Sequence, residues 1–284
     1  MPLDFTSKLD IPDYIDFNIS LEPTEVSHRK LVRNADTGKA IEIVGVKQTV
    51  IPNGIFYQSI YDTMTEVLEP WEMKDAKFKW KTGRNGGFSM MDVILPHRIE
   101  RITTPKHETV INPRWLAFTS VDGKTSANCL LGTFDQFCFN GQVNGEHNKV
   151  TGKHSSNYTN ESFIIKLQQA EKDFFLQTKK LQKMADTNTQ YVDVKSLLEK
   201  IMSKRYAEKM YSLYNEEAST RGYNAFALYS AFTNYSTYAD ERNGFNIKNT
   251  STKQDTESIT MLDRERKEVN KWVSTPQFKE LVAA

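Results

Sequence analysis

The most informative pattern in this chain is an alternation of lysine and aromatic residues: Lys77, Phe78, Lys79, Trp80 and Lys81. Alternate side chains of a strand lie on opposite faces, so the pattern predicts one apolar face and one face of ammonium groups. A Gly-rich tip with Arg84 follows, and residues 88–95 are predicted to return as a second strand. Such a hairpin could bind nucleic-acid phosphates. It could equally be a solvated edge whose lysines prevent sheet aggregation.

Lys106 continues this basic face, and four other cations would be secondary phosphate contacts, although the first two are also typical of a solvated edge: Arg29, Arg33, Arg98 and Arg101. The whole chain of 284 residues has a net charge of only +1, but the charge is unevenly placed. Residues 74–106 carry eight Lys or Arg and three Asp or Glu, whereas residues 1–25 carry one Lys and six acids. A local basic patch beside an acidic arm is compatible with nucleic-acid binding, although it also arises by chance.

Stacking aromatics would be needed beside the cations if the bound strand is single. Trp80 has the wrong parity to share the lysine face and is expected in the core, so the stacking candidates are Phe88, Tyr57 and Tyr61. A later aromatic stripe has helical spacing, which favours a core or a subunit interface over a stacking platform. It comprises Tyr206, Tyr211, Tyr214, Tyr223, Phe226, Tyr229, Phe232, Tyr235 and Tyr238.

Residues typical of metal and catalytic sites are sparse. One series of Cys and His residues comprises Cys129, Cys138, His147 and His154. Its spacings of nine, nine and seven residues are wider than those between paired zinc ligands, so we expect no metal site and a cysteine in the core. The tip 83–87 lacks the Lys-Ser/Thr of a phosphate loop. An enzyme would need His97, His107 or Asp92 to converge in one pocket. We therefore predict no cofactor and no enzymatic activity.

The elements that must position the basic hairpin follow from hydrophobic periodicity. Strands are predicted at residues 28–34, 39–47, 114–120 and 125–133, with 105–113 as a polar connection. Helices are predicted at 54–69, capped by Asn53 and ended by Pro70, and at 163–185, 192–204, 205–218, 224–239 and 258–273.

The fold class is therefore predicted as α+β: an antiparallel β-hairpin sheet with a packed helix, followed by a C-terminal helical region. The expected organisation begins with an acidic, loosely docked arm (1–25), a sheet domain with the basic hairpin (26–157) and a helical region packing on the sheet (158–242). A mobile linker (243–257) and a last helix (258–284) are expected to follow.

The chain shows neither a signal peptide nor an apolar run long enough to span a membrane. With two cysteines and no disulfide framework, it is expected in a reduced cytoplasm.

Three groups of motifs resemble one family. The hairpin 31–38, with 44–46 and Pro52-Asn53 after it, resembles the N-terminal hairpin of the domain-of-unknown-function family numbered 932, the phage/plasmid-like proteins. Residues 120–126 and 137–141 are similar to its central strands, and 224–235 to its late helix. The resemblance covers about 26–240, and it departs at Tyr238, where the family often has His.

This resemblance implies a phage or plasmid protein of DNA metabolism. Taken with the basic hairpin, it leads us to expect binding of single-stranded DNA, with strand annealing in recombination and a homo-oligomeric assembly. Lys77, Lys79, Lys81 and Arg84 would be the primary phosphate contacts. The alternative is a protein-interaction module, such as a host-takeover or anti-defence factor, using the aromatic helices and the acidic arm.

Overall fold

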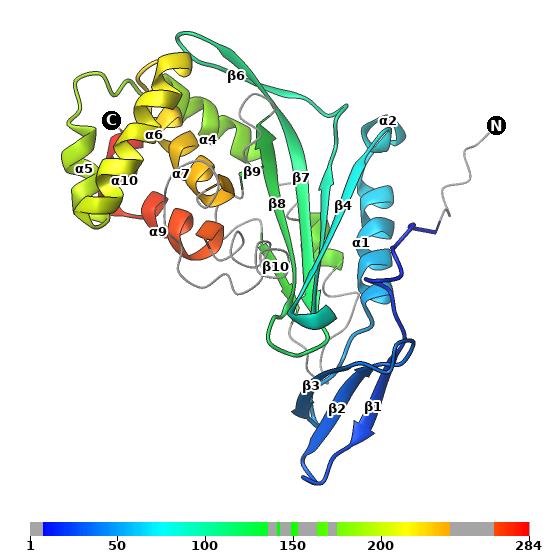
Figure 1. Ribbon diagram of the computed structural model, residues 1–284. Helices are drawn as coiled ribbons and strands as arrows, with labels where there is room; N and C mark the ends of the chain where they lie inside the picture. The colour runs from blue at the N-terminus through cyan, green and yellow to red at the C-terminus, as the bar shows by residue number, and fades with distance from the viewer. Residues whose placement is uncertain are drawn as a thin grey trace.

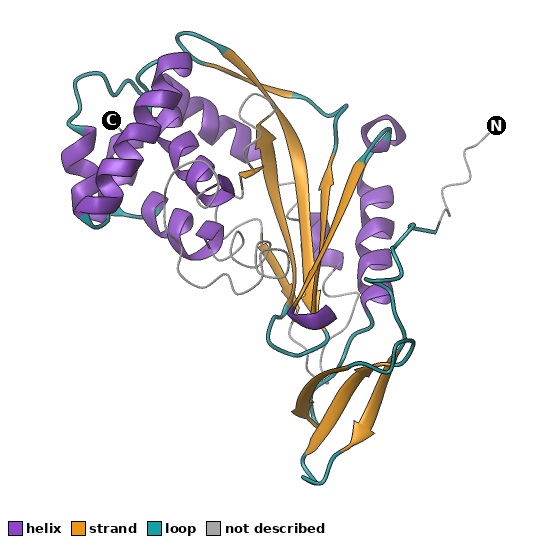
Figure 2. Ribbon diagram, in the orientation of Figure 1, coloured by secondary structure: helices purple, strands orange, loops and turns teal. Residues whose placement is uncertain are grey.

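The computed structural model describes residues 8–135, 141–142, 149–152, 164–169, 175–238 and 264–283. A long twisted antiparallel sheet stands at the centre, as Figure 1 shows. A helix at residues 53–67 and a helical segment at 164–169 cover one side of it, a group of helices lies on the other side, and a small separate sheet projects below (Figures 1 and 2). The predicted α+β class is confirmed.

The central sheet has the strand order β10-β8-β7-β5-β4, with β6 and β9 pairing at its margins. Its strands are β4 (Lys77–Gly83), β5 (Phe88–Ile94), β6 (Glu100–Thr103), β7 (Glu108–Ser120), β8 (Ala127–Asp135), β9 (Gly141–Gln142) and β10 (Lys149–Gly152). The basic hairpin exists as predicted, since β4 and β5 pair from Lys77 opposite Ile94 to Gly83 opposite Phe88. Every residue of β5 is buried, however, so only the edge strand β4 can present a solvated face.

The helix α1 (Asn53–Val67) covers the face of the sheet that carries the aromatic residues of β4. Trp80 packs edge-on against Tyr57, with ring centroids 5.0 Å apart, and the Tyr57 hydroxyl donates to Ser89 Oγ at 2.9 Å. Phe78 packs likewise against Tyr61. The assignment of Trp80 to the core is confirmed, and the lysines of β4 must therefore point to the other face.

Both ends of α1 differ from the prediction. Asn53 does not cap the helix but lies within it, and its Nδ2 donates to Ile15 O at 2.8 Å. Leu68 ends α1 in an extended conformation. Pro70 then begins a short second helix, α2 (Pro70–Met73), since proline is well tolerated in a first helical turn.

The predicted polar connection 105–113 is wrong, because β6 and the first half of β7 form a hairpin there. Strand β7 pairs with β6 up to Ile111 and with β5 from Arg114, so Asn112 and Pro113 lie in the gap between these two partners. The Asn112 Nδ2 lies within 3.2 Å of three carbonyl oxygens in the β5–β6 connection and takes the place of a strand partner there. A proline, which has no N–H for the ladder, is tolerated in such a gap.

The small sheet has the order β1-β2-β3, formed by β1 (Ile19–Pro23), β2 (Arg29–Asn34) and β3 (Ala40–Gly45). Val32 and Val44 pack with Phe17 against Val121 at the tip of the central sheet. Residues 8–25 are thus no loose arm. They contribute strand β1, and their buried side chains include Leu9 and Ile15.

The helical region consists of α4 (Phe175–Asp186), α5 (Val194–Ile201), α6 (Lys204–Arg221), α7 (Ala225–Tyr238), the π-helical turn η3 (Arg264–Val269), α9 (Asn270–Val273) and α10 (Pro276–Ala283). Residues 164–169 are also helical, whereas 170–174 and 258–263 of the predicted helices lie outside the described residues. Pro276 does not terminate the structure but begins α10. Gly222, at a φ of +83°, ends α6 and allows the tight turn into α7.

A fully buried ionic network joins this region to the sheet. Arg221, at the C-terminal end of α6, donates to Asp135 Oδ2 at 2.6 Å and to Glu217 Oε2 at 3.1 Å. Asp135 ends β8 and also accepts from Thr109 of β7 at 3.1 Å. The guanidinium lies over the ring of Phe226, 5.1 Å from its centroid. These contacts fix the helical region against one end of the sheet.

Candidate nucleic-acid interface

The lysine row on β4 is the candidate interface. Lys77 and Lys79 are exposed and Lys81 is half-buried. In the part of the chain that the structure describes, no carboxylate forms an ion pair with any of the three. Because β4 is the last strand of its sheet, the row follows an open edge.

The buried neighbours of the row explain why its charge is not neutralised internally. Asp92 lies directly across from Lys79 in the β4–β5 register. Its carboxylate instead accepts two hydrogen bonds from Arg114, at 2.8 Å to Nε and 3.0 Å to Nη2. This buried bidentate pair satisfies the acid, so the ammonium of Lys79 remains available to an external anion.

Two of the predicted contact residues have structural roles instead. Arg84 donates to Asp122 at 2.6 and 3.0 Å and to Thr125 Oγ1 at 2.9 Å, and its own φ is +52°. It thus ties the β4–β5 tip to the β7–β8 turn. Arg98 is only 5% exposed and pairs with Glu72 of α2 at 3.2 Å. We therefore remove both from the set of phosphate contacts, since moving either side chain would unpair an acid, the buried Asp122 or the half-buried Glu72.

The remaining predicted cations lie on the surface. Arg101 is exposed and pairs with Glu108 across the β6–β7 hairpin, a type of contact worth at most about 1 kcal/mol. Arg33 is held more firmly, by both carboxylate oxygens of Glu22 and by Gly38 O, and it keeps the pKa of Glu22 below its usual range. Arg29 is exposed on the small sheet. The structure thus places Arg29 and Arg33 on a different sheet from the lysine row.

The proposed stacking aromatics are not available for stacking. Phe88 and Tyr57 are buried, and Tyr61 is half-buried against Phe78. Most of the later aromatic stripe is core, as expected from its spacing: Tyr214, Phe226, Tyr229, Phe232 and Tyr235 are all buried. Tyr223 is the exception, at 45% exposed, and the side chain of Tyr238 lies outside the described residues.

The described residues bring together no catalytic or metal-binding set. His97 contacts Asp75 at 2.9 Å, His107 lies in the β6–β7 turn, where its backbone N donates to Thr104 Oγ1, and Asp92 of β5 pairs with Arg114, so the three residues belong to different elements. Among described residues, no three His, Cys, Asp or Glu side chains group as metal ligands. Cys129 is core as predicted, and its burial raises the pKa of its thiol. Cys138, His147 and His154 lie outside the described residues.

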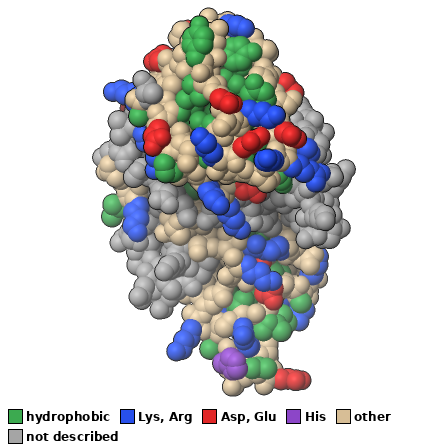
Figure 3. All heavy atoms as spheres, turned by 90° about the vertical axis from the view of Figure 1, so that its left-hand side faces the viewer, with side chains coloured by type: hydrophobic (Ala, Val, Ile, Leu, Met, Phe, Trp, Pro, Cys, Tyr) green, Lys and Arg blue, Asp and Glu red, His purple; other side chains and the backbone are tan. Residues whose placement is uncertain are grey.

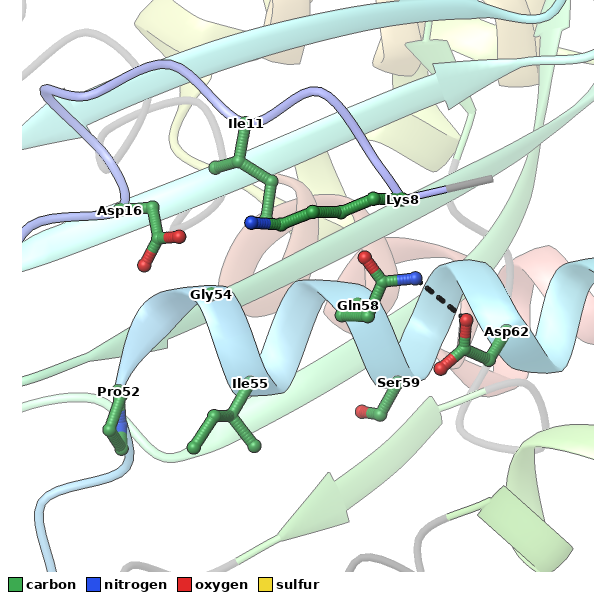
Figure 4. A pocket seen from close by; sticks show the side chains of 9 residues that line it. All are labelled: Lys8, Ile11, Asp16, Pro52, Gly54, Ile55, Gln58, Ser59 and Asp62. Carbon is green, nitrogen blue, oxygen red and sulfur yellow. Dashed lines mark hydrogen bonds between the residues drawn. The ribbon is translucent and has the colours of Figure 1, made fainter. Parts of the chain in front are cut away.

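A surface pocket with a volume of about 640 Å³ lies between the N-terminal segment and α1 (Figure 4). Lys8 and Asp16 line it from the segment, and Gln58 and Asp62 line it from the helix. Gln58 donates to Asp62 at 2.7 Å and accepts from the backbone of Leu9 at 3.0 Å. With two carboxylates and one ammonium, the pocket does not suit a phosphate, and we interpret it as the seam along which the N-terminal segment docks.

This seam depends on a glycine. A Cβ at Gly54 would lie 2.3 Å from the carboxylate of Asp16, which sits at the positive N-terminal end of α1. Because Asp16 is exposed, its carboxylate can rotate away from the new methyl group, and alanine favours the helix, so we expect Gly54→Ala to loosen residues 8–17 locally and to change stability by less than about 1 kcal/mol. Limited proteolysis and thermal denaturation would measure both effects. Gly45→Ala is the matched control, since no heavy atom lies within 4 Å of its added Cβ. Equal behaviour of the two variants would contradict the docking.

Comparison with protein families gives one match. The Domain of unknown function (DUF932) family matches residues 40–265. The chain belongs to the DUF932 family. The match to DUF932 covers the central sheet, α1 and the helical region through α7, whereas β1 and β2 precede it. Comparison with curated proteins and with solved structures gave no match.

The DUF932 match carries no statement of activity, and nothing in it points to an enzyme. The described helices include none that is both long and apolar enough to cross a membrane. Any function of this DUF932 protein must therefore be argued from its own surface.

Proposed function

We propose that this protein binds single-stranded DNA through the lysine row of β4, as an oligomeric phage or plasmid protein of DNA metabolism that acts in strand annealing. The observation that carries the proposal is the row itself: three cations on one edge strand without acidic partners among the described residues. The phage or plasmid setting, the annealing activity and the oligomer come from the family resemblance and stand on it alone.

The spacing of the row supports a phosphate backbone as its ligand. Alternate residues of an antiparallel strand are roughly 6.8 Å apart, so three successive ammonium groups span roughly 14 Å in a straight line. Such a row can follow successive phosphates of an extended strand without reading any base. On the face seen in Figure 3, Lys and Arg side chains are interspersed with Asp and Glu over the upper half of the molecule.

Fluorescence anisotropy of a labelled single-stranded oligonucleotide tests this proposal. Three phosphate contacts on a single strand predict a log–log salt slope of about −2, or about 20-fold weaker binding at 200 mM than at 50 mM salt. The same measurement with a duplex of equal length tests the strand preference. If the folded protein leaves the single strand unbound at 50 mM salt, the lysine row is only a solvated edge.

A second candidate, a protein-interaction module, is favoured by the small sheet and not by the aromatic helices. Four large apolar side chains on this projecting unit are about half exposed: Leu21, Val26, Ile43 and Val46. The helices named for this role at first bury most of their aromatics in the core. An interface of this kind would depend little on salt, so the anisotropy series separates the two candidates.

A further inference from the structure

We propose that Tyr191 and Tyr223 form a base-stacking platform for single-stranded nucleic acid, with Lys106 beside it as a phosphate contact. This inference rests on the proposed function and adds what the lysine row lacks. Cations alone do not distinguish a single strand from a duplex, whereas stacking requires bases that are free of a partner strand. We refer to Tyr191, Tyr223 and Lys106 as the tyrosine patch.

Both tyrosines are exposed at rigid positions. Tyr191 is 93% exposed, at the third position of a β-turn closed by the bond from Val192 N to Thr189 O at 3.1 Å. Tyr223, 45% exposed, follows Gly222 in the α6–α7 turn. An aromatic ring with two rotatable bonds on a fixed backbone loses little entropy when it binds, so such residues are efficient contacts.

Hydrogen bonds hold the two turns together. Thr189 N donates to Tyr223 O at 3.0 Å, and Ala225 N donates to Thr187 O at 2.9 Å. Beneath them, the Thr189 and Tyr214 hydroxyls are 2.6 Å apart, and the rings of Tyr214 and Tyr223 meet edge-on at 6.1 Å. Tyr191 is thus two residues along the chain from Thr189, which is bonded to Tyr223, so the two exposed tyrosines lie on adjacent turns joined by hydrogen bonds.

The same surface carries a cation from the sheet. A Cβ on Gly222 would lie 3.2 Å from Pro105, which places the β6–β7 turn against the α6–α7 turn. Lys106, also exposed, reaches Ser219 O with its Nζ at 3.3 Å. The nearest acids along the chain are Asp193, which accepts from Ser196 N at the start of α5, and Glu108, which pairs with Arg101. Aromatic faces beside a cation match the chemistry of a single-stranded nucleic acid.

The test compares two oligomers of equal length by anisotropy: oligothymidylate and the same deoxyribose-phosphate backbone without bases. Stacking is worth about 1–3 kcal/mol per base, which corresponds to about 5- to 150-fold in affinity. We expect Tyr191→Ala/Tyr223→Ala to bind oligothymidylate at least tenfold more weakly and the abasic oligomer within about twofold of wild type. The salt slope should not change, because no charge is removed.

Two further variants make the result specific. Tyr191→Phe/Tyr223→Phe should retain binding, since the ring is kept. Tyr14→Ala removes another tyrosine that is 55% exposed, on the N-terminal segment, and should have no effect. Unchanged oligothymidylate binding by the double alanine variant, or equal losses on both oligomers, would overturn the patch while leaving the lysine row intact. A wild type that binds neither oligomer would overturn the proposed function and the patch together.

Discussion

Replacing Arg221 by Met should destabilise this protein by about 3–5 kcal/mol, because two buried carboxylates would lose their shared cation. Asp135 and Arg221 have no exposed side-chain surface and Glu217 has 6%. Water therefore cannot compensate the lost ion pairs. Each kcal/mol shifts the melting temperature by about 2–4 °C in a protein of this size class, so calorimetry should show a fall of about 6–20 °C.

Two comparisons identify the buried charge as the cause. Arg205→Ala removes an exposed arginine from the same helix and should change stability by less than about 0.5 kcal/mol. Adding Asp135→Asn and Glu217→Gln to Arg221→Met removes the unpaired charge, so this triple variant should be more stable than Arg221→Met alone. A triple variant no more stable than Arg221→Met would mean that lost packing on Phe226, and not electrostatics, explains the effect.

The second large effect is expected from charge reversal of the lysine row. Lys77→Glu/Lys79→Glu/Lys81→Glu should weaken binding of a single-stranded oligonucleotide by about 10²-fold at low salt, because each ammonium–phosphate contact at 4 Å in water is worth about 1 kcal/mol. The salt slope should fall in magnitude by about 2, as the three phosphate contacts of the row are lost. Anisotropy titrations at several salt concentrations measure both quantities.

A matched control separates the row from the total charge. Lys200→Glu/Lys204→Glu/Lys279→Glu changes the net charge equally at exposed positions on α5, α6 and α10. We expect this variant to bind within a few-fold of wild type. Equal weakening by both triple variants would show that binding follows net charge and not the row. Melting curves should confirm that the β4 variant is folded, since Lys81 is half-buried.

Family membership, fold class and most elements could be predicted from the sequence because they depend on local patterns. Alternation at period two predicted β4, with Trp80 on the core face, and a period near 3.6 predicted α6 and α7. These signals come from residues that are neighbours in the chain. They failed where a distant contact replaced the local one. The Asn112 side chain takes the place of a strand partner beside Pro113, so the start of β7 was not predicted. Residues 8–25 pack on α1 and on the tip of the central sheet, which are contacts between distant parts of the chain.

The candidate site shows the same division. The sequence determined that Lys77, Lys79 and Lys81 share one face of a strand. It could not show that Arg84 and Arg98 are bound by acids 38 and 26 residues away, which only the tertiary structure decided. It also assigned Tyr223 to the core stripe and passed over Tyr191, whose exposure depends on two turns that meet across 34 residues. Periodicity is set by the backbone of each element, whereas the partner and the exposure of a charged or aromatic side chain are set by contacts between elements.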